Sequence, residues 1–149
     1  KKIPQLQSKH KIRIYSGDPL QNLFDPLFKN YLDKNNFQLN EVCAGCMVGV
    51  SYVYINHEGV FSFCPMLNTL SMGNLLTEDI SFIWKNNSTL KKIRKKEFNE
   101  DSNCKECNFK QVCGGCRARA FFENKDLFSN DPYCNKNVLN EIKTLWSKK

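Results

Sequence analysis

Eight cysteines are the most reactive feature of this chain of 149 residues. They form three Cys-x2-Cys pairs and two single positions, in the order Cys43-x2-Cys46, Cys64, Cys104-x2-Cys107, Cys113-x2-Cys116 and Cys134. Each pair brings two thiolates onto one tight turn, which is the reach that a metal ion or the edge of a metal cluster requires. Eight such ligands make two sets of four.

The spacing between the pairs favours iron–sulfur clusters over zinc. Zinc ribbons usually separate their two Cys-x2-Cys pairs by ~15–20 residues, whereas five residues lie between Cys107 and Cys113. Such crowding is more typical of clusters, because a dense run of cysteines can send its last member to a second cluster. Gly45, Gly114 and Gly115 lie inside these turns, where a Cβ would crowd the ligands. Two structural zinc ions remain open on spacing alone, and disulfides are not expected in a reducing compartment.

Charge and hydropathy argue against nucleic-acid and membrane proteins. The formal net charge is +7, but two clusters, each carrying about −2 with its thiolates, would lower it to about +3. The densest basic run, residues 91–96, is interpreted as the solvated face of a helix, so we expect no nucleic-acid partner. No apolar run approaches the ~20 residues of a membrane span, and the Lys-rich N-terminus leads into no signal-peptide core. We therefore expect a cytoplasmic protein without membrane contact.

The first 40 residues predict a strand followed by a helix. A short strand is expected over residues 12–15. Apolar residues then recur at helical spacing from Leu20 to Leu32. Asp25 is placed to cap a helix that has Pro26 at its first position.

The cysteine-bearing part predicts a β-hairpin and short helices. Residues 52–56 and 60–64 alternate around a Gly-containing turn at residues 57–59, which is typical of a hairpin. Gly73-Asn74 predicts another turn. Helical stripes are expected over residues 80–84 with a continuation at 90–93, over 117–122 and over 138–146.

Four further side chains are candidates for contacts with a cluster or a substrate. Arg117 and Arg119 follow Cys116, and they could bond cluster sulfides or a substrate carboxylate. A surface position or a salt bridge to Asp131 is an equally open interpretation of both. Tyr52 and Tyr54 are candidates for the lining of a substrate face, and the hairpin core is expected for one of the two.

Residues 43–134 resemble a SPASM domain, the auxiliary-cluster domain of radical SAM enzymes. The matching pieces are Cys43-x2-Cys46, Tyr54-Ile55-Asn56, Gly59, Cys64-Pro65, Gly73-Asn74, Ile83-Trp84, Cys104-x2-Cys107-x5-Cys113-Gly-Gly-Cys116-Arg117-Ala118-Arg119-Ala120 and Asp131-Pro132-Tyr133-Cys134. Residues 10–34 resemble the last strand–helix unit of the partial (β/α) barrel that precedes this domain.

The resemblance implies a ligand pattern that interleaves along the chain. It assigns auxiliary [4Fe–4S] cluster I to Cys43, Cys46, Cys64 and Cys116. It assigns auxiliary [4Fe–4S] cluster II to Cys104, Cys107, Cys113 and Cys134. The sequence departs from the pattern at Cys113 and Cys116, which are separated by two residues where some members of the family have three.

The implied fold is a small α+β domain that is cross-linked by its clusters and preceded by one strand–helix unit. Residues 1–40 would be the terminal unit of a partial barrel, 41–136 the SPASM domain with two clusters and 137–149 a C-terminal helix. The radical SAM signature C-x3-C-x2-C does not occur in these residues, and a (β/α) barrel needs ~200 residues or more. The chain alone is therefore not expected to cleave S-adenosylmethionine. That cofactor and a third [4Fe–4S] cluster are expected in a radical SAM barrel that is the partner of this part.

The resemblance also implies a role. The two clusters would transfer electrons, and the domain would help to position the substrate. The first expectation for the substrate is a ribosomally made peptide that is modified after translation. Tetrapyrrole-modifying relatives share the CGGCRARA and DPYC features, so modification of a haem precursor is the alternative. A non-enzymatic zinc-binding or RNA-binding module is the third hypothesis.

Overall fold

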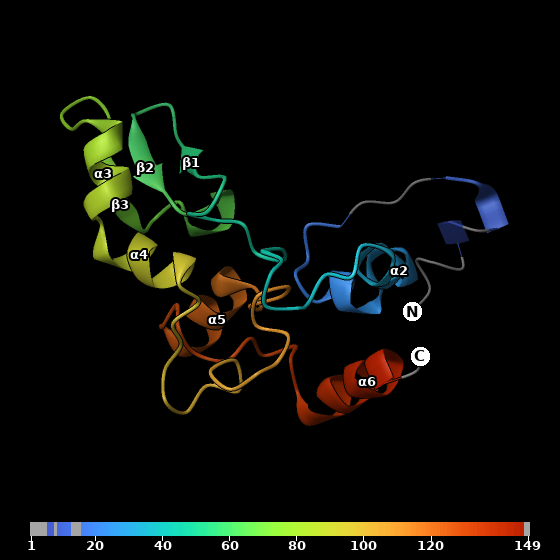
Figure 1. Ribbon diagram of the computed structural model, residues 1–149. Helices are drawn as coiled ribbons and strands as arrows, with labels where there is room; N and C mark the ends of the chain where they lie inside the picture. Colours follow the sequence, from blue (N-terminus) through green and yellow to red (C-terminus); the bar gives the residue numbers. More distant parts are fainter. Residues whose placement is uncertain (1–5, 8, 13–15, 148–149) are drawn as a thin grey trace.

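The computed structural model describes residues 6–7, 9–12 and 16–147, and it has the expected α+β architecture (Figure 1). A three-stranded antiparallel sheet has the strand order β1-β2-β3. The elements are η1 (Gln21–Phe24), α2 (Pro26–Lys34), β1 (Tyr54–Ile55), β2 (Val60–Ser62), η2 (Pro65–Leu67), β3 (Ser71–Asn74), α3 (Ile80–Asn86), α4 (Ser88–Arg94), α5 (Arg117–Asn124) and α6 (Lys136–Ser147). The strand expected over residues 12–15 falls mainly on residues 13–15, which lie outside the described residues.

The N-terminal helical segment forms as its sequence predicts. The carboxylate of Asp25 accepts a hydrogen bond of 2.9 Å from the backbone N–H of Leu27, and Pro26 occupies the first position of α2. An aspartate cap satisfies a donor that the helix leaves free, and proline has no N–H to lose at that position. The helix ends at Lys34, with Asn35 as its C-cap.

The hairpin is confirmed, but the sheet has one strand more than the sequence predicted. Residues Tyr54 and Ile55 pair with Ser62 and Phe61, so the strands are shorter than expected. The Gly73-Asn74 turn prediction is wrong in position, because Gly73 pairs with Phe61 inside β3. A free strand edge offered this segment backbone partners, and that outweighs the local turn preference of a Gly-Asn pair. The turn begins after the strand.

The helical stripe over residues 80–93 is divided between α3 and α4. Asn87 ends α3 and caps α4, because its side-chain oxygen accepts hydrogen bonds from Thr89 N–H and Leu90 N–H. These helices pack with the sheet and α5 into the first hydrophobic core. Its buried members are Val48, Phe61, Phe63, Leu67, Ile83, Leu90, Ile93, Ala118 and Leu127.

A second hydrophobic core joins the two ends of the chain. Its buried members are Leu20, Leu23, Phe109, Val112, Cys113 and Ile142. The indole N–H of Trp146 in α6 donates a hydrogen bond of 2.9 Å to the carbonyl of Leu23. In Figure 1, α2 and α6 accordingly lie away from the sheet, at the other end of the molecule. Within the described residues, no helix has the length and apolar character needed to cross a lipid bilayer.

Candidate metal centre

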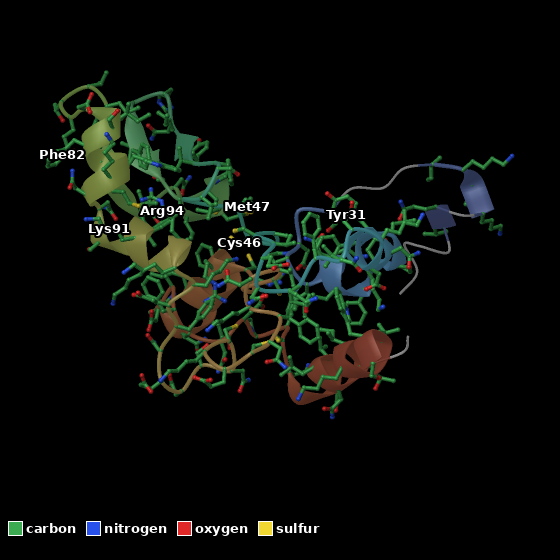
Figure 2. All side chains as sticks on the ribbon, in the orientation of Figure 1. Tyr31, Cys46, Met47, Phe82, Lys91 and Arg94 are labelled. Carbon is green, nitrogen blue, oxygen red and sulfur yellow. The ribbon has the colours of Figure 1, made fainter. Side chains whose placement is uncertain are left out.

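The first Cys-x2-Cys turn packs directly on the third. Backbone N–H groups of Ala44 and Cys46 donate to the carbonyls of Gln111 and Cys113, each at 3.1 Å. Gly45 makes this approach possible, since a Cβ at that position would lie 2.2 Å from the carbonyl oxygen of Cys113. Cys46 is thereby held in the loops between the sheet and α2 (Figure 2). Cysteines that are about 70 residues apart in sequence thus share one small region.

A first thiol set consists of Cys46, Cys64 and Cys116. Burial raises the pKa of the Cys64 thiol. The backbone N–H groups of Met66 and Leu67 oppose that rise, whereas negative charge on Cys46 and Cys116 adds to it. All three side chains are half-buried against the first hydrophobic core. They are neighbours, although 70 residues separate the first from the last.

A second thiol set consists of Cys104, Cys107, Cys113 and Cys134. Burial raises the pKa of the Cys113 thiol to about 12, although the Gly115 N–H donates to its sulfur at 3.3 Å. Charge on the other three members raises that pKa further. Burial also raises the pKa of Cys134 to about 12, with Cys104 and Cys107 as the next contributors. Of this set, Cys107, Cys113 and Cys134 pack in or against the second hydrophobic core.

Cys43 is the exposed member of the eight. Cys43 and Cys46 both lie near the buried ammonium of Lys96, on which the charges of both thiols act. All eight cysteines are free thiols. The two sets are neighbourhoods of thiols: across the part of the chain that the structure describes, no three Cys, His, Asp or Glu side chains are close enough to hold one metal ion.

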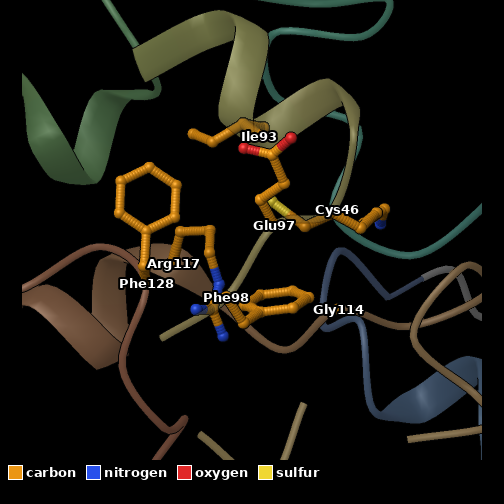
Figure 3. A pocket seen from close by; sticks show the side chains of 8 residues that line it. Cys46, Ile93, Glu97, Phe98, Gly114, Arg117 and Phe128 are labelled. Carbon is orange, nitrogen blue, oxygen red and sulfur yellow. The ribbon is translucent and has the colours of Figure 1, made fainter. Parts of the chain in front are cut away.

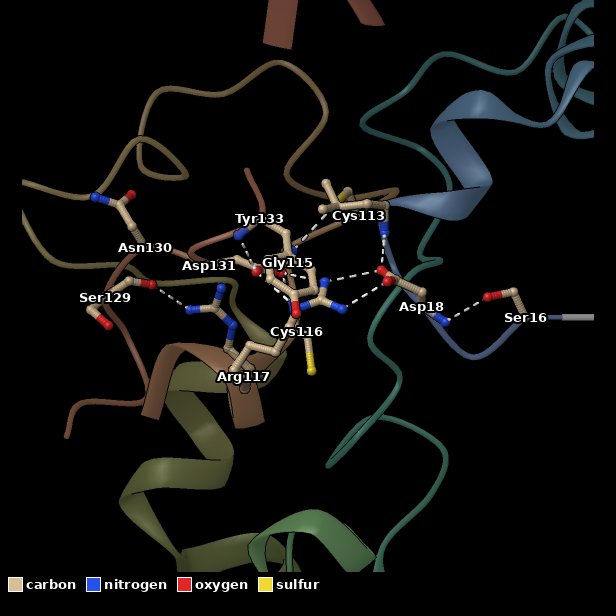
Figure 4. A network of polar contacts seen from close by, with 12 residues as sticks. Ser16, Asp18, Cys113, Gly115, Cys116, Arg117, Ser129, Asn130, Asp131 and Tyr133 are labelled. Atoms are coloured by element: carbon tan, nitrogen blue, oxygen red, sulfur yellow. Dashed lines mark hydrogen bonds and ion pairs between the residues drawn. The ribbon is translucent and has the colours of Figure 1, made fainter. Parts of the chain in front are cut away.

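A network of polar contacts fixes the backbone at Cys116 (Figure 4). Asp131, which is 1% exposed, accepts hydrogen bonds from the N–H of Cys116 at 2.7 Å and from the N–H of Tyr133 at 3.0 Å. Arg119 pairs with Asp131 at 2.7 Å and with Asp18 at 2.7 Å. For Arg119, the salt-bridge interpretation is therefore confirmed. The network ties the N-terminal segment to the loop that carries Cys134.

Arg117 and Lys96 are buried, which the sequence did not predict. Arg117 is 5% exposed and donates from Nη1 to the carbonyls of Leu127 and Ser129, so it makes no salt bridge to Asp131. Lys96, which is 6% exposed, was placed on a solvated helix face. That interpretation is wrong for this residue, because α4 ends at Arg94 and the chain then turns Lys96 inward.

Tyr52 lies near two members of the first thiol set. Burial raises its pKa, and charges on Cys64 and Cys46 raise it further. Tyr54 lies on β1 opposite Ser62. Tyr52 precedes β1, and the sequence alone gave no reason to prefer it over Tyr54.

Comparisons with known proteins agree with the cysteine pattern. Residues 46–108 match the model of SPASM, described as an iron–sulfur cluster-binding domain. The chain is 31% identical to the AdoMet-dependent heme synthase of Nitratidesulfovibrio vulgaris over 100 residues. These residues cover 67% of this chain and 27% of that protein.

Two further relatives carry the same name. Identity is 31% over 100 residues with the protein of Oleidesulfovibrio alaskensis, covering 67% of this chain and 25% of that protein. It is 33% over 90 residues with the protein of Methanosarcina barkeri, covering 60% of this chain and 25% of that protein. The chain thus spans about a quarter of the length of the curated relatives it matches. No solved structure gives a significant match.

Proposed function

This chain belongs to the SPASM family of iron–sulfur cluster-binding domains, and from that premise we propose that it holds two auxiliary [4Fe–4S] clusters in a radical SAM enzyme that acts on a haem precursor. Cluster I is held by Cys43, Cys46, Cys64 and Cys116. Cluster II is held by Cys104, Cys107, Cys113 and Cys134. The clusters supply electron transfer, and the chain supplies their ligands and the scaffold that keeps the two sites apart.

The observation that carries the proposal is the grouping of the thiols. Cys113 and Cys116 are close in sequence, yet Cys113 has the second thiol set as neighbours, whereas Cys116 is a neighbour of Cys64. The two sets also pack on different hydrophobic cores. Both features support an interleaved pair of four-thiolate sites.

Iron and sulfide analysis distinguishes this proposal from two structural zinc ions. Protein purified without oxygen should be brown and contain about eight iron and eight sulfide per chain, because each [4Fe–4S] cluster uses four thiolates. A colourless protein with two zinc ions would contradict the proposal, since zinc has a filled d shell and no redox chemistry.

The relatives favour a tetrapyrrole over the peptide that was the first expectation for the substrate. Three similar proteins are named AdoMet-dependent heme synthase, and none of these names refers to a peptide. The chain corresponds to about a quarter of each. We assign cleavage of S-adenosylmethionine, with its own [4Fe–4S] cluster, to a barrel outside residues 1–149.

Mass spectrometry tests the substrate class. The enzyme that contains this chain is incubated with S-adenosylmethionine, a low-potential reductant and a haem precursor that bears carboxylate side chains. The expected product is lighter by the mass of carbon dioxide and two hydrogen atoms: one hydrogen atom goes to the 5′-deoxyadenosyl radical, the other leaves as a proton, and the remaining electron passes to an auxiliary cluster. An unchanged precursor together with a modified peptide substrate would return the assignment to peptide maturation.

A further inference from the structure

Two buried cations lie beside Gly114 and Gly115, where the chain passes from the second thiol set to the first. The ammonium of Lys96 donates a hydrogen bond of 3.3 Å to the carbonyl of Ala44. A Cβ added to Gly114 would lie 2.9 Å from that ammonium. The glycine therefore allows the lysine to reach the region between the two thiol sets.

Arg117 approaches the same point from α5. A Cβ on Gly115 would lie 2.6 Å from its Nη2. Its guanidinium carbon lies 4.9 Å from the centre of the Phe98 ring, and Nη1 is engaged by two backbone carbonyls. Nε and Nη2 are buried and have no hydrogen-bond partner in the described residues. Arg117 and Lys96 both line one small pocket, to which Cys46 and Gly114 also contribute (Figure 3).

Both cations lack a carboxylate partner. No ion pair in the described part of the chain includes Lys96 or Arg117. Burying an unpaired cation costs free energy, and burying two near each other adds repulsion between them. Two free donors on a buried arginine add a further desolvation cost. Glu97 also lines the pocket, but its ion pair is with Lys95 at 3.5 Å, so the arrangement still calls for a negatively charged acceptor in the same region.

The neighbouring thiols identify that acceptor. Charges on Cys43, Cys46 and Cys113 act on Lys96, while the charge of Arg117 acts on Cys104 and Cys134. The cations therefore lie near members of both proposed cluster sites. With side chains only 5% and 6% exposed, they fit a group enclosed by the fold better than a substrate carboxylate that must enter and leave.

We propose that Arg117 and Lys96 are cluster-supporting cations: Arg117 donates Nε–H and Nη2–H to sulfur atoms of a bound cluster, and Lys96 offsets the negative charge between the two sites. The inference rests on the proposed function, because it requires the clusters. Hydrogen bonds to cluster sulfurs and nearby charge set the reduction potential. A cation stabilises the reduced cluster, which is the more negative form, and so raises that potential.

The test measures the reduction potential of each cluster by anaerobic titration followed by paramagnetic resonance, with iron and sulfide counted in parallel. The variants are Arg117→Gln, Lys96→Met and the charge-conserving Arg117→Lys. Arg94→Gln is the matched control, because Arg94 is a partly buried arginine that stacks 4.2 Å from the Trp84 ring and donates to Gly49. Arg94 does not line the pocket that Lys96 and Arg117 share.

At a fixed ambient potential, each neutral variant should show about a tenfold lower ratio of reduced to oxidised cluster in at least one site, which is 59 mV for one electron. Arg117→Lys should lie between Arg117→Gln and wild type, because it keeps the charge and loses the two-donor geometry. Arg94→Gln should match wild type.

The outcomes separate this inference from the function. If the wild-type protein contains no iron, the proposed function is wrong, and the inference that depends on it is wrong as well. Wild-type protein with two clusters and neutral variants of unchanged potential would overturn the inference alone. If Arg117→Gln fails to fold, since it also loses bonds to two carbonyls, Lys96→Met decides, because that change removes one hydrogen bond and keeps the apolar stem.

Discussion

The carboxylate of Asp131 accepts a 2.7 Å hydrogen bond from the backbone N–H of Cys116. Asp131 itself lies three residues before Cys134 in the same loop. One buried carboxylate thus holds the backbone next to a proposed ligand of cluster I and lies on the loop that carries a proposed ligand of cluster II. Its charge is balanced by Arg119, whose guanidinium bonds to both carboxylate oxygens. The relation makes Asp131 a link between the two sites.

Asp131→Asn should weaken both sites and destabilise the fold. The amide can accept on one side only, so Cys116 N–H or Arg119 loses a charged partner. Removing one partner of a buried ion pair costs about 3–5 kcal/mol, and the lower end is expected here because the Arg119 side chain is 22% exposed. Urea unfolding of the cluster-loaded protein, with iron content, measures the effect.

The control for Asp131→Asn is Asp33→Asn. Asp33 forms an i,i+4 ion pair with Lys29 on the surface of α2, and its side chain is 57% exposed. Such pairs contribute ~0.3–0.5 kcal/mol. Equal shifts in the two variants would contradict the role given to Asp131.

Gly45→Ala should disrupt the packing of the first Cys-x2-Cys turn on the third. The backbone at Gly45 has φ +76°, and the added Cβ would lie 2.2 Å from the carbonyl oxygen of Cys113. The left-handed conformation alone costs an alanine about 1–2 kcal/mol, and the clash requires the turn to move. We expect lower iron content and a lower thermal midpoint. Gly17→Ala is the control, since nothing lies within 4 Å of its added Cβ, and a comparable loss in that variant would count against the packing argument.

Asp18→Asn should loosen the N-terminal segment from the SPASM domain. Burial raises the pKa of Asp18, but its bonds to Arg119 and Leu20 N–H outweigh burial and hold the pKa below 3.8. The group therefore contributes stability above pH 3.8, and that contribution is lost as the pH falls through the folded-state pKa. Because the side chain is 36% exposed, about 1 kcal/mol or less is expected at pH 7.

The measurement for Asp18→Asn is the difference in unfolding midpoint from wild type as the pH is lowered from 7. The difference should persist down to about pH 3.8 and shrink as the pH falls further, through the folded-state pKa. Hydrogen exchange should increase in residues 16–24. A difference that grows toward acid would mean that the carboxylate is not held in its charged form.

Local patterns in the sequence predicted the elements that local rules govern. The Asp25 cap with Pro26 and the Gly-containing hairpin turn follow from hydrogen bonding and backbone freedom within a few residues, and both are present. The third strand was missed because eight residues separate it from its partner β2, and pairing outweighed the turn preference of Gly73-Asn74.

The site shows the same division between local and long-range information. Cysteine spacing predicted two groups of ligands, and family resemblance supplied the interleaving that stays a prediction here. The burial of Lys96 could not be read from a run of six basic and apolar residues, because it depends on where α4 ends and on Gly114, which is distant in sequence. Long-range contacts of this kind leave no local periodicity.

The interleaved pair of clusters is the central claim, and two single substitutions test it most directly. Iron content and paramagnetic resonance are recorded for reduced Cys116→Ala and Cys134→Ala, next to wild type. The account predicts that Cys116→Ala damages the signal of the cluster held by Cys43, Cys46 and Cys64. It predicts that Cys134→Ala damages the signal of the cluster held by Cys104, Cys107 and Cys113. Loss of the same signal in both variants would contradict the account.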